Sequence, residues 1–281
     1  MTPDFGADAE RIAALALAED GHRDLTSDVT VAPEARASAR LEFRSVGVLA
    51  GRVYAVAVAR VCGCEVNWDA AEGEHVARHA VVGSVTGPLA PLLRAERPLL
   101  NLLQRASGIA TTTHACVGAV SGTAARILHT RKTAPGLRLL DVCGVLAGGG
   151  ELHRLDLAHA VMVKDNHWRA LAAQGKTLRS ALAEARALGA EALQVEVESE
   201  GQLQAACEAG ATRLLLDNQS PETVRRWAAA ARELAPGMEI EATGGITLEN
   251  VRAYALAGAD FISVGALTHS VKAADIGLEV E

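Results

Sequence analysis

Hydrophobic and polar side chains alternate along residues 36–45, near the beginning of the chain. Ala37, Ala39, Leu41 and Phe43 would share one face of an extended strand, with charged and hydroxyl side chains on the other face. A strand with one solvated face is typical of an antiparallel sheet. Short segments with glycine and proline follow it. The pattern predicts an N-terminal α+β domain of about a hundred residues.

From Ala125 onward the chain consists of short apolar runs that each end in polar residues or glycine. Six runs follow one another: ARILHT, AVMVKDNH, ALQVEVES, RLLLDNQ, EIEATGG and FISVGA. Segments with helical spacing of apolar residues lie between them, as in TLRSALAEARAL and PETVRRWAAAAREL. Repeated alternation of strand and helix predicts a βα barrel or an open doubly wound sheet. No G-x-G-x-x-G follows the first run, which counts against a dinucleotide-binding fold.

The ends of these runs carry charged residues or glycine, and in a βα barrel the C-terminal ends of the strands form the active site. The residues at these ends are Thr130-Arg131-Lys132, Lys164-Asp165-Asn166-His167, Glu196, Asp217-Asn218, Thr243-Gly244-Gly245 and Ser263-Val264-Gly265. Backbone N–H groups of a glycine turn and a nearby helix N-terminus bind phosphate well. We therefore expect a phosphate site at the last two ends, with the helix after Gly245 beginning near Thr247.

Charge is distributed unevenly among these candidates. Residues 126–169 hold seven Lys or Arg and four His against four acidic residues, in a chain whose formal net charge is −7. This segment would supply a cationic wall, made of Arg131, Lys132, His153, Arg154 and Lys164. A basic surface patch is the alternative interpretation. Glu196 and Asp217 would face the wall, to bind a divalent cation or sugar hydroxyls or to transfer protons. For these acids the alternative is a buried ion pair with Lys164.

The remaining composition narrows the class of protein. A negative net charge argues against general nucleic-acid binding, and no apolar run reaches the length needed to cross a membrane. The first residues lack the basic and apolar regions of a signal peptide. The five cysteines include one close pair, too few for a zinc site. We therefore expect reduced thiols and a cytoplasmic location.

Motifs along the whole chain resemble the quinolinate phosphoribosyltransferase family. They include EDGHRDLTSD, GVLAG, ERPLLNLLQRASGIAT, TRKTAPGLR, GGGELHRL, KDNH, VEVES, LLLDN, TGGI and VGALTHSVKAADIGLE, in the family's order. The resemblance implies two domains. One is an N-terminal α/β sandwich of residues 1–107 that is completed by residues 271–281. The other is an incomplete α/β barrel of residues 108–270 with fewer than eight strands.

The resemblance also implies an activity, which is phosphoribosyl transfer from 5-phosphoribosyl 1-pyrophosphate to quinolinate in NAD biosynthesis. The reaction uses Mg²⁺ and gives nicotinate mononucleotide, pyrophosphate and CO₂. The implied quinolinate ligands are Arg131, Lys132, His153, Arg154 and Lys164, with Thr130 beside them. Glu196 and Asp217 would act on the ribose and metal side, next to Asn218. The implied phosphate cradle is Thr243-Gly244-Gly245 with Ser263-Val264-Gly265.

The resemblance further implies a homodimer in which Arg97 reaches the site of the partner chain. Its own chain offers no obvious route from this segment to the mouth of the barrel. The apolar residues Leu99–Leu103 follow it and would suit burial at a two-fold interface. The alternative is that Arg97 pairs with Glu96 on its own helix.

Three positions depart from the family pattern. His129 stands where the family usually has Asp, Leu152 where Asn usually precedes His-Arg, and Arg23 where glycine is common. The first two flank cations expected to bind the acid, so they bear on which acid is used. Four alternatives remain open: a paralogous transferase for another aromatic carboxylate, a molybdate-transport-associated sister protein, an aldolase-like barrel with Lys164 as Schiff-base nucleophile, and a catalytically silent binding barrel.

Overall fold

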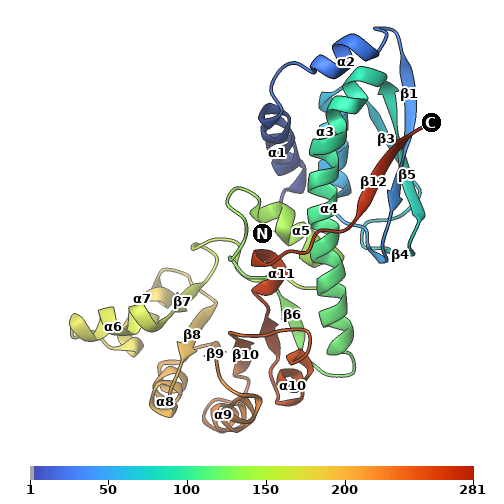
Figure 1. Ribbon diagram of the computed structural model, residues 1–281. Helices are drawn as coiled ribbons and strands as arrows, with labels where there is room; N and C mark the ends of the chain where they lie inside the picture. Colours follow the sequence, from blue (N-terminus) through green and yellow to red (C-terminus); the bar gives the residue numbers. More distant parts are fainter. Residues whose placement is uncertain (1–2) are drawn as a thin grey trace. The chain divides into compact units, whose positions relative to one another are not determined.

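The computed structural model describes residues 3–281, and the chain divides into two compact units. Among the described residues, the first comprises residues 3–114, 133–150 and 267–281, and the second comprises residues 115–132 and 151–266. Residues 108–114, 133–150 and 267–270, which the sequence analysis assigned to the barrel, group with the first unit. Each unit is described by itself below, and Figure 1 labels their elements.

The first unit combines helices with a four-stranded antiparallel sheet of order β12-β1-β5-β3. Its elements are α1 (Phe5–Glu19), α2 (Leu25–Thr30), β1 (Arg36–Phe43), β2 (Gly47–Val48), α3 (Arg52–Val61), β3 (Glu65–Trp68), β4 (His75–Val76), β5 (Ala80–Pro88), most of α4 (Leu89–Ala119), α5 (Arg138–Ala147), most of α11 (Ala266–His269) and β12 (Ile276–Val280). In β1, Ala39, Leu41 and Phe43 are fully buried. The alternation therefore predicted the strand and its buried face correctly.

A buried ion pair fixes α5 to α4 within this unit. Asp141 on α5 has no solvent exposure, and it accepts two hydrogen bonds from Arg105 on α4, at 2.7 and 2.9 Å. The backbone N–H of Ala134 also donates to this carboxylate. A bidentate guanidinium–carboxylate pair is both strong and directional, so it holds the position of α5 as well as contributing to stability.

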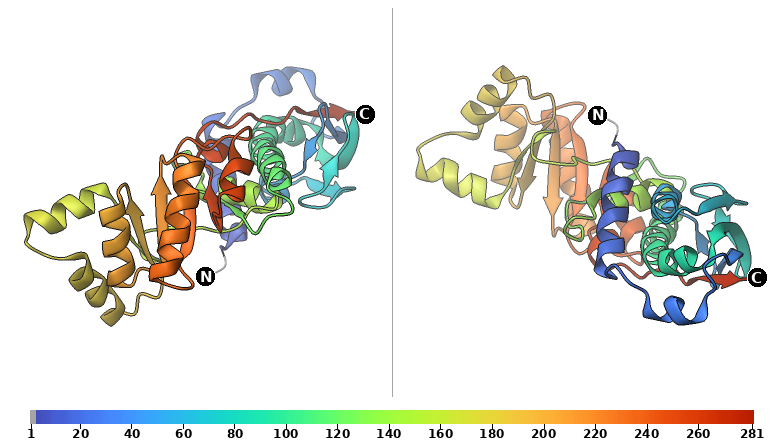
Figure 2. Two further views of the ribbon diagram at one scale, coloured as in Figure 1. Left: turned by 90° about the horizontal axis from the view of Figure 1, so that it is seen from below. Right: turned by 90° about the horizontal axis from the view of Figure 1, so that it is seen from above.

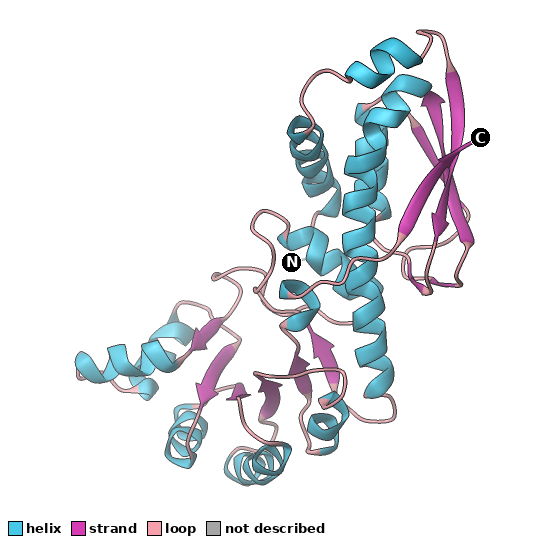
Figure 3. Cartoon of the chain, viewed as in Figure 1, coloured by secondary structure: helices cyan, strands magenta, loops and turns pink. Residues whose placement is uncertain are grey.

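The second unit is a sheet of six parallel strands in the order β6-β11-β10-β9-β8-β7. Its elements are β6 (Arg126–Leu128), β7 (Val161–Val163), α6 (Asp165–Ala173), α7 (Leu178–Ala187), β8 (Leu193–Val197), α8 (Glu200–Ala209), β9 (Arg213–Asp217), α9 (Pro221–Leu234), β10 (Glu239–Thr243), α10 (Val251–Leu256) and β11 (Phe261–Ser263). All six apolar runs form the predicted strands, which Figure 3 shows in magenta. Figure 2 shows α8 and α9 beside the strands that they connect.

The barrel is incomplete, as expected. The first strand, β6, pairs with the last, β11, and β7 pairs with β8, so the two strands that are consecutive in sequence, β6 and β7, lie at opposite edges of the sheet. A single parallel bridge joins Leu128 of β6 to Glu151. This bridge extends the sheet beyond β6 by one residue, in the place where a further strand would lie.

The expected helix near Thr247 begins later, and this prediction was wrong. The helix α10 starts at Val251, and residues 248–250 form a turn. The side chain of Asn250 accepts from the Thr247 N–H at 2.8 Å and donates to the Gly245 carbonyl at 3.0 Å. An asparagine that bonds to nearby backbone offers the chain an alternative to helix, which delays the start of α10.

Candidate active site

Four of the predicted strand ends lie along one edge of the second unit's sheet. Lys164 follows β7, Glu196 lies in β8, Asp217 ends β9 and Thr243 ends β10. Because the strands are parallel and in register, these residues share the C-terminal edge, and Asp217 pairs directly with Thr243. In barrels this edge carries the reactive groups.

Lys164 and Glu196 form an ion pair at this edge. The Lys164 Nζ donates to Glu196 Oε2, and the Glu196 side chain is only 6% exposed whereas that of Lys164 is 42% exposed. The pairing that the sequence analysis held as an alternative for Glu196 is therefore present. An amine engaged with a buried carboxylate is not free to attack a carbonyl, so the pair argues against Lys164 as a Schiff-base nucleophile.

Asp217, Asn218 and Gly244 form a tight turn region beside this pair. Asn218 has a left-handed backbone, with φ of 53°, and its side-chain amide donates to Asp217 Oδ2 at 2.6 Å. Its backbone N–H donates to the Thr243 carbonyl at 2.9 Å. Gly244 has φ of 82°, and a Cβ there would lie 2.3 Å from Asn218 Oδ1. Glycine is therefore required at 244 both by its backbone conformation and by the lack of space.

The residues of the last strand end are more buried than a phosphate cradle suggests. Ser263 and Val264 are only 4% and 2% exposed. The Ser263 hydroxyl donates to Glu241 at 2.6 Å, and the Val264 N–H donates to the Leu128 carbonyl. Gly265 is half-buried. Gly265 is therefore the more accessible part of this segment.

Two guanidinium groups of the predicted cationic wall lie within electrostatic reach of each other. Burial lowers the pKa of Arg154, the charge of Arg131 lowers it further, and Glu241 opposes both. The Nε of Arg131 is buried and has no hydrogen-bond acceptor among residues 3–281. The Arg154 guanidinium donates to the Ala160 carbonyl at 3.3 Å. Two neighbouring cations, one of which has an unused donor, suit the binding of an anion. Lys132 follows Arg131 and is exposed.

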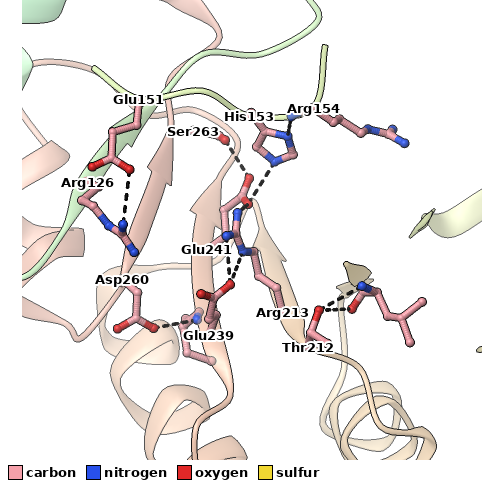
Figure 4. A network of polar contacts seen from close by, with 12 residues as sticks. Arg126, Glu151, His153, Arg154, Thr212, Arg213, Glu239, Glu241, Asp260 and Ser263 are labelled. Atoms are coloured by element: carbon pink, nitrogen blue, oxygen red, sulfur yellow. Dashed lines mark hydrogen bonds and ion pairs between the residues drawn. The ribbon is translucent and has the colours of Figure 1, made fainter. Parts of the chain in front are cut away.

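A buried polar network lies next to His153 and Arg154, and its central residue, Glu241, was missed by the sequence analysis (Figure 4). Glu241 on β10 is 1% exposed and accepts from Ser263 Oγ, His153 Nε2 and Arg213. Burial by itself would raise the pKa of Glu241, but the hydrogen bonds from His153 and Ser263 and the charge of Arg213 outweigh it and hold the pKa below its ordinary value. A carboxylate in the middle of an apolar parallel strand was the signal that could have found it.

His153 faces this network. Its side chain is 7% exposed, and Figure 4 shows its ring directed at Glu241 while the Arg154 side chain points away. His129, one of the departures from the family pattern, is fully buried and lies edge-on to the His153 ring, with centroids 6.4 Å apart. Leu152, a second departure, is 39% exposed.

Arg97 lies in the first unit, on α4. Its side chain is 61% exposed, and its nearest carboxylate, on Glu96, is 4.0 Å away. An exposed pair at this distance contributes little stability, so the guanidinium is available to a ligand or partner. The expectation that the following leucines lie at an interface was wrong. They are buried in the core of their own chain: Leu99, Leu100, Leu102 and Leu103.

Residues 3–281 contain no cluster of three or more His, Cys, Asp or Glu side chains that could hold a metal ion. In that same range, no helix has both the length and the apolar character needed to cross a membrane. All five cysteines are free thiols.

Comparisons with known proteins identify one family over most of the chain. The family model described as quinolinate phosphoribosyl transferase, N-terminal domain, matches residues 24–107, and that of the C-terminal domain matches residues 109–279. The nicotinate-nucleotide pyrophosphorylases [carboxylating] of Rattus norvegicus and Mycobacterium leprae are each 40% identical. They align over 89% and 92% of this chain and 84% and 91% of their own lengths.

Solved structures give the same result. The nicotinate-nucleotide pyrophosphorylase from Francisella tularensis superposes with a TM-score of 0.90 at 32% identity, covering 100% of this chain and 98% of that one. NadC from Streptococcus pyogenes gives 0.89 at 31% identity, covering 100% and 99%.

An open parallel α/β barrel with cations, carboxylates and a glycine turn along one strand edge defines a barrel enzyme that acts on anionic substrates. The family matches span nearly all of the chain, and relatives with 40% identity align over most of it. The chain belongs to the quinolinate phosphoribosyltransferase family.

Proposed function

We propose that this protein transfers the 5-phosphoribosyl group from 5-phosphoribosyl 1-pyrophosphate to quinolinate, releasing pyrophosphate and CO₂ and forming nicotinate mononucleotide. The observation that carries the proposal is the C-terminal edge of the six-stranded sheet. It gathers the pair Lys164–Glu196, the carboxylate of Asp217 and the turn at Gly244. These groups suit a substrate that carries phosphate and a sugar.

Quinolinate carries two adjacent carboxylates on an aromatic ring, so its binding needs more than one cation. Arg131 and Arg154 have neighbouring charges, and the Nε of Arg131 has no acceptor among the described residues. A guanidinium can grip a carboxylate with two parallel hydrogen bonds. We therefore propose that these two arginines hold the two carboxylates, with Lys132 beside them.

Departure of pyrophosphate leaves positive charge on the ribose ring, which Glu196 and Asp217 would stabilise electrostatically. The ring nitrogen of quinolinate bonds to the sugar and becomes positive. The bond from ring carbon 2 to its carboxylate then breaks, CO₂ leaves, and the electron pair stays on the carbon next to the positive nitrogen. A proton takes the vacant position, and Lys132 and Lys164 are the two candidate donors.

Magnesium suits this arrangement as a companion of the substrate. Mg²⁺ keeps several waters and is held by one or two carboxylates together with substrate phosphates, so it does not need the protein-only cluster that residues 3–281 lack. We propose that Asp217 and Glu196 hold it, directly or through water. When bound, the ion supplies charge that neutralises the pyrophosphate.

The proposed assembly is a homodimer in which Arg97 completes the site of the partner chain. Its exposure and its weak contact with Glu96 support this role. The leucines that follow Arg97 do not support it, since they pack inside their own chain. A cytoplasmic location stays a prediction.

The test of the function is incubation with quinolinate, the phosphoribosyl donor and Mg²⁺, with mass spectrometry for the nucleotide. Nicotinate should be a poor substitute, because it lacks the second carboxylate. Arg154→Ala should abolish turnover. The matched control is Arg126→Ala, since Arg126 is exposed at the opposite end of β6 and pairs with Glu151 at the surface. Equal turnover of nicotinate and quinolinate contradicts the proposal.

Other aromatic 1,2-dicarboxylates belong in the same assay. His129 and Leu152 both flank the cations, so a preference for another acid would identify the protein as a paralogous transferase. Binding of both substrates without turnover would instead support the alternative of a catalytically silent binding barrel.

A further inference from the structure

The buried carboxylate of Glu241 is linked to the cationic wall through one side chain, His153. The Nε2 of His153 lies 3.2 Å from Glu241 Oε2, and its Nδ1 lies 2.6 Å from the backbone nitrogen of Arg154. Both ring nitrogens are therefore engaged within the protein (Figure 4). This arrangement leaves His153 no ring nitrogen for a substrate.

The hydrogen bonds determine which nitrogen of His153 carries the proton. A backbone N–H can only donate, so Nδ1 must accept from Arg154 and carries no proton. The ring proton then lies on Nε2 and is donated to Glu241. The histidine thus connects a carboxylate on β10 to the backbone of the residue that holds one of the two neighbouring guanidiniums.

Glu241 is itself held from two other strands. Ser263 on β11 donates to its Oε1 at 2.6 Å, and Arg213 on β9 donates to its Oε2 at 3.2 Å. Arg213 also lies over the ring of Phe261, 3.7 Å from the centroid, and pairs with Glu239. These hydrogen bonds from the two neighbouring strands leave the carboxylate of Glu241 little freedom to move. A side chain that orients a second side chain must itself be held in this way.

The negative charge of Glu241 also favours the position of Arg154. Arg131 and Arg154 repel each other, and the carboxylate of Glu241 is the group that offsets this repulsion at Arg154. A buried anion close to one of two neighbouring cations lowers the cost of keeping them together before an anionic ligand arrives.

We propose that Glu241 is a positioning residue that acts through His153 to hold Arg154 in place for the acid substrate. His153 is then a link inside the protein, in place of the substrate ligand that the family resemblance implied. The inference deepens the proposed function and rests on it for the identity of the acid.

The kinetic test compares Glu241→Gln with the matched control Glu239→Gln. Glu239 lies on the same strand and shares Arg213, but its described contacts do not include His153. Glu241→Gln should raise KM for quinolinate by about 10- to 100-fold, the usual effect of losing a hydrogen bond to a charged group. KM for the phosphoribosyl donor should change much less. Equal effects of both variants on the quinolinate KM overturn the proposal.

A double-mutant cycle tests whether Glu241 acts through His153. His153→Asn and Glu241→Gln should be strongly non-additive, because each breaks the same link. The double variant should therefore resemble the more affected single variant. Additive changes in KM would mean that Glu241 and His153 act separately, and the proposal then fails. Glu241→Asp keeps the charge and should recover part of the lost affinity. It also replaces Glu241→Gln in the cycle if that variant does not fold.

A third measurement does not depend on turnover. Nitrogen-15 NMR of histidine-labelled wild-type protein should show His153, assigned from His153→Asn, as the Nε2–H tautomer at neutral pH. A proton on Nδ1 overturns the proposal. Phthalate, an aromatic 1,2-dicarboxylate without a ring nitrogen, serves as a binding probe and should bind more weakly to Glu241→Gln. If wild type does not convert quinolinate, the proposed function fails, whereas the tautomer and the phthalate result still decide the role of Glu241.

Discussion

Two properties of the turn require glycine at position 244, namely its left-handed backbone and the lack of space for a Cβ. Replacing Gly244 by alanine, and Gly245 as a control, separates their effects. Gly244 and its neighbour Gly245 both have left-handed backbones, with φ of 82° and 61°. A Cβ at 244 would lie 2.3 Å from Oδ1 and 2.7 Å from the backbone nitrogen of Asn218, whereas a Cβ at 245 would meet no atom within 4 Å. Gly245→Ala is therefore a control that changes the backbone energy alone.

The expected magnitudes follow from this geometry. A left-handed conformation costs a residue with a Cβ about 1–2 kcal/mol, so both variants lose about that much stability. Gly244→Ala must also move Asn218, whose backbone is tied to Thr243. Forcing extra atoms into a filled space costs about 1–3 kcal/mol. We therefore expect Gly244→Ala to lose about 2–5 kcal/mol in all, clearly more than its neighbour.

Urea unfolding of both variants, followed by circular dichroism, measures the difference in the free energy of unfolding. Steady-state kinetics should show a larger rise in KM for the phosphoribosyl donor in Gly244→Ala, because a displaced Asn218 no longer holds Asp217. Equal losses of stability in the two variants would refute the steric argument. An unchanged donor KM in Gly244→Ala would refute the link from this turn to Asp217.

Three further outcomes are expected. Asp141→Ala should lower the free energy of unfolding by about 3–5 kcal/mol in urea titrations, since it leaves Arg105 without its buried partner; a loss below about 1 kcal/mol would contradict this. Asp217→Asn should mainly reduce kcat, because the charge acts when the ribose becomes cationic; intact turnover with weaker donor binding would leave it a positioning role only. Mixing inactive Arg97→Ala and Lys164→Ala chains under subunit exchange should restore some activity, and a mixture that stays inactive despite confirmed exchange would rule out a shared site.

The strands of the barrel were predictable because each apolar run is short and ends in a distinctive polar or glycine residue. The pairing of β6 with β11 was not, since it joins segments that are distant in sequence. The delayed start of α10 depends on one side chain, Asn250, bonding to the backbone in three dimensions. The pattern of apolar residues along a sequence indicates which residues are buried. It does not indicate which other residues they contact in the fold.

The same limit explains the errors at the candidate site. Leu99 and Leu103 were correctly recognised as residues that must be buried, but the pattern could not distinguish the core of their own chain from an interface. Glu241 was not predicted because it lies inside a strand and not at its end. A parallel strand covered on both faces buries each of its residues, so an acid inside such a strand requires partners. The sequence EIEAT alone therefore indicates a buried acid with polar partners.

The antiparallel sheet of the first unit has a consequence for how the protein is made. The strand β1 pairs on one side with β5 and on the other with β12, which includes residues as late as Val280. During synthesis, β1 and β5 emerge early, yet one edge of β1 stays open until residues 44–275 have been added. An open strand edge is a template for pairing with other chains, and domains otherwise tend to fold as they emerge. The nascent chain therefore passes through a long interval in which this edge must be shielded from other nascent chains, and fragments that end before Ile276 should aggregate.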